Sequence, residues 1–449
     1  MSRSVAQRPD PPSRLLVAGL RGGSGKTTVA LGLAAALRAR GAAPAAFKKG
    51  PDYIDAAWLA LASGGPCRNL DTFIMSEADV ARSVLRCAES GRMALIEGNR
   101  GLYLRIAAVI LNQVSGARHE RTVRESIERY CSAPILGAIP RLRDAPFHDR
   151  HLGLIPPQED PRAAEALDWA ARLAEAHLDI GGLLRIARQT DDGRLLDAAQ
   201  QPPGPTRPVF IAARAARPRI AVLRDAAFQF YYPENLEALR ALGAEVVECS
   251  ALEDARLPEA DALYIGGGFP ETQAQRLADN ASFRESVRQA ALANLPIYAE
   301  CGGLMYLGRS LLLRQGEFPM AGVLPFRFRI SHKPQGHGYA ALRVERENPF
   351  YPVGLELRGH EFHYSSIANA EALETARLAC RVERGHGIDG RRDAVCQGGV
   401  FALYTHVHAL GTPQWGTGIV SAAERHRAAA SGERRAENGG KQAAMDAEE

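Results

Sequence analysis

A glycine-rich segment near the N-terminus, Gly22–Thr28, places the strongest constraint on how this chain can fold. It follows the apolar run 15–18 and precedes a second apolar run, 29–37, that is typical of an amphipathic helix. A strand, a glycine turn and a helix in this order let several backbone N–H groups point at one phosphate. Leu20 stands where the strict P-loop spacing requires glycine, and Gly19 comes one place early, so we predict a variant P-loop. An ordinary glycine turn before a helix is the alternative that this context disfavours.

The P-loop predicts which residues of the N-terminal half bind the phosphates of ATP and Mg²⁺. Lys26 would reach the outer phosphates of ATP, and the Thr27 hydroxyl would hold Mg²⁺. The apolar strand 92–97 ends in Glu97, the usual position of a second Mg²⁺ ligand at the carboxyl edge of a P-loop sheet. The predicted phosphate-binding residues are Gly22, Gly23, Ser24, Gly25, Lys26, Thr27 and Thr28.

A Gly-Pro turn at residues 50–55 carries two further carboxylates. Asp52 and Asp55 are three residues apart and can face one point, which suits a metal ion or a polar substrate group. Capping of the following helix is the alternative interpretation, which the neighbouring P-loop makes less attractive. We assign Asp52 to the metal site with Thr27 and Glu97, and we assign Asp52, Tyr53 and Asp55 to substrate contacts.

One connection in this half is too short for a regular parallel sheet. The strand expected at 104–111 follows Glu97 almost directly, whereas a parallel crossover needs about a dozen residues or more. Three explanations remain open: the two strands are antiparallel, they are not neighbours, or a connecting unit has been lost.

Length and alternating strand and helix patterns predict an α/β protein of two doubly wound domains. The net charge of +4 does not favour nucleic-acid binding, and no apolar run is long enough for a membrane. Seven cysteines without a CxxC pair and a polar N-terminus favour the cytoplasm. The expected segments are a disordered N-terminus (1–13), a P-loop domain (14–200), a proline-rich linker (201–217), a second domain (218–422) and a disordered tail (423–449).

The second domain has a candidate nucleophile. Cys301 lies between an apolar strand and a helix and is followed by two glycines, an elbow whose helix end we expect to stabilise a thiolate. Gly267 and Gly268 would donate backbone N–H groups to an oxyanion. His406 and His408 end another apolar strand, and spacing does not decide which is the base.

A third cluster, residues 359–365, contains His360 and His363 beside glycine and aromatic residues. The two histidines are three residues apart, whereas zinc proteases use a spacing of four on a helix. We therefore do not expect catalytic zinc here.

Taken together, the ordered motifs resemble cobyrinic acid a,c-diamide synthases over about residues 14–422. This family joins a dethiobiotin-synthetase-like ATP-binding domain to a class I glutamine amidotransferase domain. The motifs that carry the resemblance are residues 23–28, 49–55, 68–71, 97–103, 300–307 and 359–365.

The resemblance implies amidation of the a and c carboxylates of a corrin precursor, using ATP, Mg²⁺ and glutamine, through an acyl phosphate. It implies that Cys301 is the glutaminase nucleophile, that His406 is the base and that Asn112 belongs to the nucleotide site. Class I amidotransferases often have a glutamate where this chain has His408, so the third member of the triad is unassigned. We expect a tetrapyrrole and glutamine as partners, no nucleic acid or membrane, and we consider a homodimer.

The chain departs from the family after Tyr103, where the family continues with aspartate, glycine, a helix and a strand. Here Leu104 follows directly, which indicates an internal deletion. We expect impaired synthetase activity and surviving glutaminase chemistry. Two alternatives stay open: amidation of another tetrapyrrole, such as hydrogenobyrinic acid or nickel sirohydrochlorin, and a non-catalytic relative that binds nucleotide or tetrapyrrole.

Overall fold

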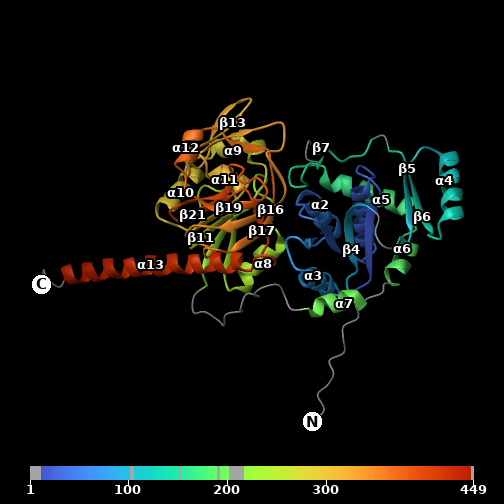
Figure 1. Cartoon of the computed structure of the whole chain (residues 1–449), viewed down its shortest axis with the longest axis horizontal. Helices are drawn as coiled ribbons and strands as arrows, with labels where there is room; N and C mark the ends of the chain where they lie inside the picture. Colours follow the sequence, from blue (N-terminus) through green and yellow to red (C-terminus); the bar gives the residue numbers. More distant parts are fainter. Residues whose placement is uncertain are drawn as a thin grey trace, which may run out of the picture. The chain divides into compact units, whose positions relative to one another are not determined.

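The structure, a computed structural model, describes residues 12–101, 106–142, 144–150, 153–189, 193–201 and 217–445 (Figure 1). Contacts divide the chain into an N-terminal unit, Met1–Thr72 with Ser76–Gly204, and a C-terminal unit, Phe73–Met75 with Pro205–Glu449. The N-terminal unit and the C-terminal unit are described separately below. The predicted N-terminal segment and linker lie almost entirely outside the described residues.

The N-terminal unit is built around a parallel sheet with the strand order β1-β4-β2-β3. The carboxyl ends of these strands carry the predicted site residues, since Glu97 lies on β4 and the P-loop follows β1. The strands are β1 (Arg14–Gly19), β2 (Ala45–Lys49), β3 (Cys67–Leu70) and β4 (Ala94–Arg100), and the intervening helices are α1 (Lys26–Ala39), α2 (Ile54–Ser63) and α3 (Glu77–Glu89).

The next two strands form a sheet of their own. β5 (Val109–Val114) pairs in parallel with β6 (Ile135–Pro140), and neither strand joins the four-stranded sheet. Of the three explanations for the short connection, the structure therefore selects strands that are not neighbours. The strand also begins later than the predicted position 104, and the expected deletion point after Tyr103 lies outside the described residues.

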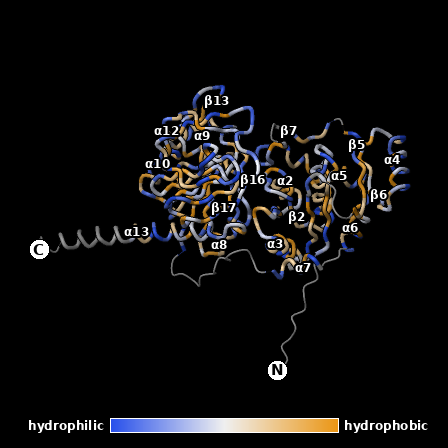
Figure 2. The backbone as a smooth tube through the Cα atoms, viewed as in Figure 1, coloured by the Kyte–Doolittle hydropathy of each residue, from blue (hydrophilic) through white to orange (hydrophobic). Residues whose placement is uncertain are grey.

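The helix α4 (Ala117–Tyr130) connects β5 to β6, but it has no buried residue and is hydrophilic along its length (Figure 2). The helix α5 (Ala163–His177) is better packed than α4 and lies against α1. A Cβ atom at Gly32 would lie 2.6 Å from the carbonyl oxygen of Ala170, so glycine permits the close approach of the two helices. The remaining elements are β7 (Asp149–Arg150), β8 (Gly153–Leu154), α6 (Ile180–Ala187) and α7 (Gly193–Gln200).

A ten-stranded mixed sheet forms the core of the C-terminal unit, with the order β10-β9-β11-β12-β21-β20-β19-β16-β17-β22. The first five strands pair in parallel, and the remaining pairs are antiparallel. The strands are β9 (Arg219–Leu223), β10 (Glu245–Cys249), β11 (Ala262–Ile265), β12 (Ile297–Glu300), β16 (Gly336–Val344), β17 (Glu356–His363), β19 (Leu378–Arg384), β20 (Arg392–Gln397), β21 (Val400–Leu403) and β22 (His406–Val407).

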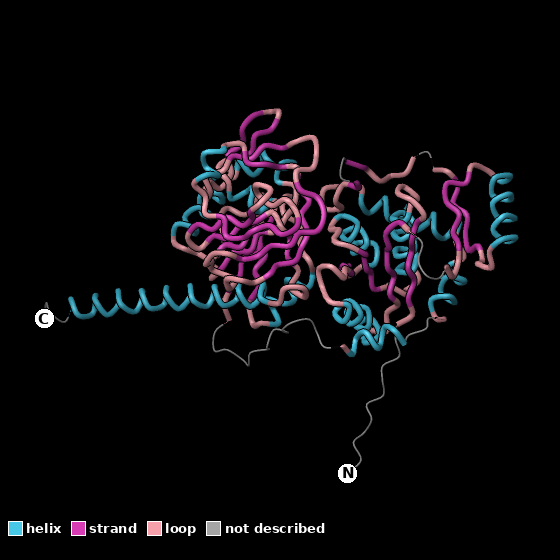
Figure 3. The backbone as a smooth tube through the Cα atoms, in the orientation of Figure 1, coloured by secondary structure: helices cyan, strands magenta, loops and turns pink. Residues whose placement is uncertain are grey.

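Helices and a second, four-stranded sheet surround this core, as the helix and strand colours in Figure 3 make visible. Tyr264, Tyr298 and Phe401 fill one face of the large sheet with fully buried aromatic rings. The helices are α8 (Pro233–Ala241), η1 (Pro270–Gln273), α9 (Ala274–Asp279), α10 (Ala281–Leu292), α11 (Gly302–Leu307) and α12 (Ala370–Glu374), and the second sheet holds β13 (Ser310–Leu313), β14 (Gly316–Pro319), β15 (Arg327–Ile330) and β18 (Ser365–Ile367).

The C-terminal helix α13 (Gln414–Met445) begins inside the predicted second domain and extends past its predicted end at residue 422. The sequence predicts a disordered tail from residue 423, whereas the structure has helix through Met445. Trp415, Ile419 and Ala423 are fully buried in the core of the unit, so its first turns belong to the fold. Among the helices of the described residues, none has the length and apolar character needed to cross a membrane.

Candidate functional site

The P-loop folds tightly back on the end of β1. Gly23 and Gly25 have φ angles of 69° and 78°, which residues other than glycine rarely adopt. Gly25 is the N-cap residue of α1. A Cβ atom at Gly19 would lie 2.1 Å from the Ser24 Oγ atom and 2.7 Å from Cγ of Lys26. The early glycine is therefore required by the loop, a role that the strict motif spacing does not predict.

Thr27 and Glu97 meet behind the loop, as the sequence predicts. The Thr27 hydroxyl donates to Oε1 of Glu97 over 2.8 Å, and Lys48 Nζ lies 3.2 Å from the same oxygen. Lys48 also lies 2.8 Å from Oδ2 of Asp55 and 3.8 Å from Oδ2 of Asp52. Sequence reasoning missed Lys48, whose only signal was its place at the end of β2 beside the two aspartates.

The charges of this cluster depend on one another. Burial opposes the charge of Lys48, but Asp55, Asp52 and Glu97 outweigh this effect and raise its pKa. Burial, followed by the negative charge of Asp55, raises the pKa of Glu97, which is fully buried. Lys48 is thus a single cation that lies within 4 Å of all three carboxylates.

The same cluster suits a divalent cation. Among the described residues, Oε2 of Glu97 is buried and has no hydrogen-bond partner. A hydroxyl and several carboxylate oxygens are the ligands that Mg²⁺ prefers. Thr27 and Glu97 therefore offer oxygen ligands for the predicted metal, and Asp52 joins the same cluster through Lys48.

The turn that carries the aspartates is held by its own hydrogen bonds. Oδ1 of Asp52 accepts from the backbone N–H of Asp55, so Asp52 also supports the start of α2, as the capping interpretation proposed. The side-chain amide of Asn69, on β3, donates to the carbonyls of Gly50 and Asp52 over 2.7 and 3.0 Å. Asn69 lies in one of the motifs that carry the family resemblance, but no local sequence pattern predicts these two hydrogen bonds.

Asn112 joins the end of β5 to the P-loop. Its side-chain amide donates to the Ser24 carbonyl over 2.8 Å, and Gln113 donates to the Gly23 carbonyl over 3.2 Å. Beside them a cavity of about 370 Å³ opens next to the loop. Its lining residues are Gly25, Thr28, Val29, Asn112, Gln113, Ile139, Pro140, Arg141, Leu142 and Ala145.

In the C-terminal unit, Cys301 forms a strained elbow between β12 and α11. Its φ and ψ angles are 48° and −98°, a conformation that non-glycine residues seldom adopt. Burial raises the pKa of the Cys301 thiol, and Glu271 adds to this effect. The backbone N–H of Gly302, at the start of α11, lowers the pKa of the thiol as expected of a helix end, although burial has the larger effect.

The glycine loop after β11 lies between Cys301 and His406. A Cβ atom at Gly302 would lie 2.9 Å from the backbone nitrogen of Gly268. A Cβ atom at Gly267 would lie 2.4 Å from Cε1 and 3.2 Å from Nε2 of His406. The structure thus brings together the predicted nucleophile, the oxyanion glycines and one of the two candidate histidines.

His408 points to a different part of the core. Its Nε2 atom lies 3.6 Å from Oε2 of Glu234, and its ring lies 4.4 Å from the ring of Tyr232. The residues that the structure describes contain no group of three or more His, Cys, Asp or Glu side chains that could hold a metal, which includes the run around His360 and His363.

Comparisons with known proteins decide the family. Residues 15–151 match the CobQ/CobB/MinD/ParA nucleotide-binding domain, and residues 219–414 match the CobB/CobQ-like glutamine amidotransferase domain. A cobyrinate a,c-diamide synthase of Magnetococcus marinus is 38% identical over 90% of this chain and 95% of its own. The chain belongs to the cobyrinate a,c-diamide synthase family.

Two further cobyrinate a,c-diamide synthases support this placement. The one from Methanothermobacter thermautotrophicus is 35% identical over 90% of this chain and 97% of its own, and that of Listeria innocua is 33% identical over 89% and 97%. These matches confirm the predicted family, the two α/β domains and the carbon–nitrogen ligase class.

The alignment with the Magnetococcus protein also shows that this chain lacks some of the residues of that relative. The match to the Magnetococcus protein extends over 455 residues, more than the 449 of the whole chain, although only 90% of this chain takes part. The Magnetococcus protein therefore has residues without a counterpart here, as an internal deletion requires.

Proposed function

We propose that this chain amidates the a and c side-chain carboxylates of cobyrinic acid, with ATP as phosphoryl donor and glutamine as the source of ammonia. The observation that carries the proposal is the presence of two assembled sites in one chain. Thr27 and Glu97 meet at the P-loop of the N-terminal unit, and the Gly267 loop lies beside His406 in the C-terminal unit. We place the reaction in the cytoplasm, where thiols such as that of Cys301 stay reduced.

In the N-terminal unit, a substrate carboxylate attacks the γ-phosphorus of ATP, which forms an acyl phosphate and releases ADP. Lys26 and the loop N–H groups would stabilise the charge that develops on the transferred phosphoryl group. Thr27, Asp52 and Glu97 would hold Mg²⁺, which supplies further charge neutralisation when it is bound. Tyr53 and Asp55 would orient the corrin side chain.

In the C-terminal unit, His406 accepts the proton of the Cys301 thiol, and the sulfur attacks the side-chain amide of glutamine. Backbone N–H groups of Gly267 and Gly268 would stabilise the tetrahedral oxyanion. Proton return from His406 releases ammonia and leaves a thioester, which water hydrolyses to glutamate. Ammonia then attacks the acyl phosphate and displaces inorganic phosphate.

The direct test incubates the protein with cobyrinic acid, ATP, Mg²⁺ and glutamine and follows the corrinoid by mass spectrometry. We expect the mass change of two carboxyl-to-carboxamide conversions, dependent on ATP and on glutamine. Cys301→Ala should abolish the reaction with glutamine and retain it with ammonium chloride. Parallel reactions with hydrogenobyrinic acid and nickel sirohydrochlorin identify the ring, and preference for either one would overturn the assignment to cobyrinic acid.

A second candidate function has its own structural support. Among the described residues, β1 lies at an edge of the four-stranded sheet and β5 does not join that sheet. The sheet therefore lacks the further strand to which the segment that the family has after Tyr103 would connect. We infer impaired acyl-phosphate formation with preserved glutaminase chemistry. Amidation at least tenfold slower than glutamine hydrolysis would support this second function, and equal rates of the two reactions would exclude it.

A further inference from the structure

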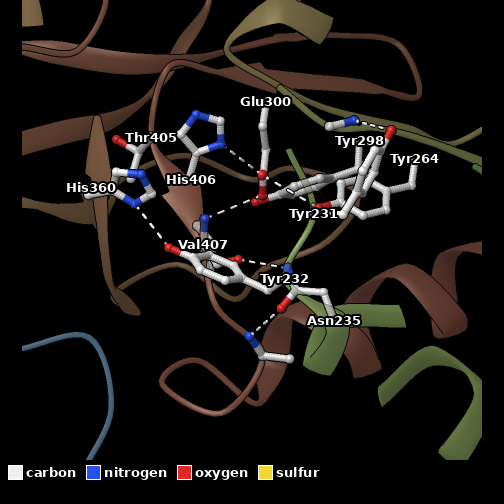
Figure 4. A network of polar contacts seen from close by, with 12 residues as sticks. Tyr231, Tyr232, Asn235, Tyr264, Tyr298, Glu300, His360, Thr405, His406 and Val407 are labelled. Carbon is white, nitrogen blue, oxygen red and sulfur yellow. Dashed lines mark hydrogen bonds and ion pairs between the residues drawn. The ribbon is translucent and has the colours of Figure 1, made fainter. Parts of the chain in front are cut away.

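A buried carboxylate faces the side of His406 that lies away from the Gly267 loop. Oε2 of Glu300 lies 3.2 Å from Nδ1 of His406, as drawn in Figure 4. Oε1 of the same carboxylate accepts from the backbone N–H of Val407 over 3.3 Å. The side chains of Glu300 and His406 are 0% and 2% exposed, so both are removed from solvent.

The sheet brings the two residues together. Glu300 ends β12, which pairs in parallel with β21 and places Glu300 opposite Leu403. The backbone N–H of Cys301 donates to the Leu403 carbonyl over 2.8 Å, which fixes the register at the carboxyl edge. His406 follows three residues after Leu403, so it reaches the carboxylate that directly precedes the nucleophile.

His408, which occupies the position where the third member of the triad usually lies, cannot orient His406 as a carboxylate would. His408 stands where class I amidotransferases often have glutamate, and it is not an anion that could accept from His406. Its Nδ1 atom accepts from the backbone N–H of Leu410 over 3.1 Å, and its Nε2 atom faces Glu234. The third place of the triad is therefore open to another carboxylate.

We propose that Glu300 is the positioning residue that orients His406 and stabilises its protonated form during glutamine hydrolysis. This inference rests on the proposed glutaminase chemistry of Cys301. With Nδ1–H of His406 donating to Glu300, the Nε2 atom beside Gly267 is the lone-pair nitrogen. It takes the Cys301 proton, and the imidazolium then carries a positive charge next to the carboxylate.

The surroundings of the pair contain no second cation that would replace this function among the described contacts. The Tyr264 hydroxyl, from β11, donates to Glu300 over 3.5 Å, and the ring of His360, from β17, stacks on His406 at 5.0 Å. Burial lowers the pKa of His360 far below its usual value, so this neighbour stays neutral. Burial raises the pKa of Glu300, while its contact with His406 opposes this shift and favours the carboxylate.

The test compares Glu300→Gln with Glu300→Asp and with a matched control, Glu234→Gln. Glu234 is the other buried carboxylate that faces a histidine of the same run, at 3.6 Å from His408. Two measurements are made for each variant: glutaminase kcat and KM, and the rate of Cys301 alkylation by iodoacetamide between pH 5 and pH 10. Thermal unfolding reports whether the variant is folded.

We expect Glu300→Gln to lower glutaminase kcat by about 10²- to 10⁴-fold with little change in KM, as for a triad that loses its orienting charge. The alkylation profile should move to higher pH, because loss of the anion that stabilises the imidazolium outweighs the relief of direct repulsion between Glu300 and the Cys301 thiolate. Glu300→Asp should restore part of both effects, and Glu234→Gln should stay within about threefold of the unmodified protein.

Either of two results would overturn the inference: an alkylation profile of Glu300→Gln that coincides with that of the unmodified protein, or an equal loss in Glu234→Gln. If Glu300→Gln does not fold, the profile of Glu300→Asp decides in the same way. These assays need no corrinoid, so a failure to amidate cobyrinic acid would refute the proposed function without touching the role of Glu300.

Discussion

The hydroxyl of Thr27 and the carboxylate of Glu97 are joined by a 2.8 Å hydrogen bond across 70 residues of sequence. The contact brings the start of α1 to the middle of β4, and it leaves the second carboxylate oxygen of Glu97 buried without a hydrogen-bond partner among the described residues. Two polar side chains are thus held in place before any ligand arrives.

Glu97→Gln should weaken Mg²⁺-dependent ATP binding by at least about tenfold, because it removes an anionic ligand from the proposed metal site. Glutamine hydrolysis in the other unit should be unchanged. Titration of ATP with and without Mg²⁺ measures the effect. Glu175→Gln is the control, since Glu175 forms an exposed pair with Arg40 and should leave ATP binding as it is.

Gly19→Ala should destabilise the protein by about 1 to 3 kcal/mol, because the new methyl group would overlap Ser24 and Lys26. Thermal unfolding without nucleotide is the measurement. Gly22→Ala, in the same loop, meets no atom within 4 Å and should not lower the melting temperature. Equal melting temperatures for the two variants would contradict the close packing described for Gly19.

Lys48→Met should cost about 3 to 5 kcal/mol of stability near neutral pH, because it leaves buried carboxylates without their cation. The loss should shrink as the pH falls. Since the pKa of Glu97 is already raised in the folded protein, the folded state binds protons more readily than the unfolded state, and acid favours folding of the variant.

Denaturant unfolding of Lys48→Met at pH 8 and pH 5 measures this difference. The neighbouring exposed residue Lys49 offers a matched control, and Lys49→Met should change the free energy of unfolding by no more than about 0.5 kcal/mol. A loss that is the same at both pH values would show that Lys48 stabilises the fold by packing and not by charge.

A stop codon after residue 431 should leave the fold of the C-terminal unit intact, whereas a stop after residue 413 should prevent it. The longer protein keeps Trp415, Ile419 and Ala423, which are fully buried, and removal of one buried Trp alone costs about 3 to 5 kcal/mol. Soluble expression and circular dichroism of the two proteins provide the measurement. Folding of the shorter protein would show that α13 is dispensable.

Local patterns in the sequence predicted much of the fold. The strand, glycine turn and helix around the P-loop agree with the structure, because the apolar runs 15–18 and 29–37 and the glycines between them are contiguous in the sequence. The elbow at Cys301 was also predicted, since the strand, the cysteine and the two glycines are contiguous.

The contacts that sequence reasoning missed all depend on pairing between distant segments. Glu300 meets His406 only because β12 and β21 are parallel in one register, and nothing near either residue encodes that alignment. Lys48 and Asn69 likewise gain their roles from neighbouring parallel strands, β2 and β3. Gly19 was noticed as an irregularity, but its contact with Ser24 becomes visible only when the loop closes.

The position of β1 at the edge of its sheet has a practical consequence for handling the protein. An edge strand can accept a strand from another molecule, and Leu16 on β1 leaves 45% of its surface exposed. Self-association through this strand is therefore expected to rise with concentration. Light scattering of Leu16→Lys beside the unmodified protein measures it, and a variant that stays dispersed at higher concentration would make purification and crystallisation practicable.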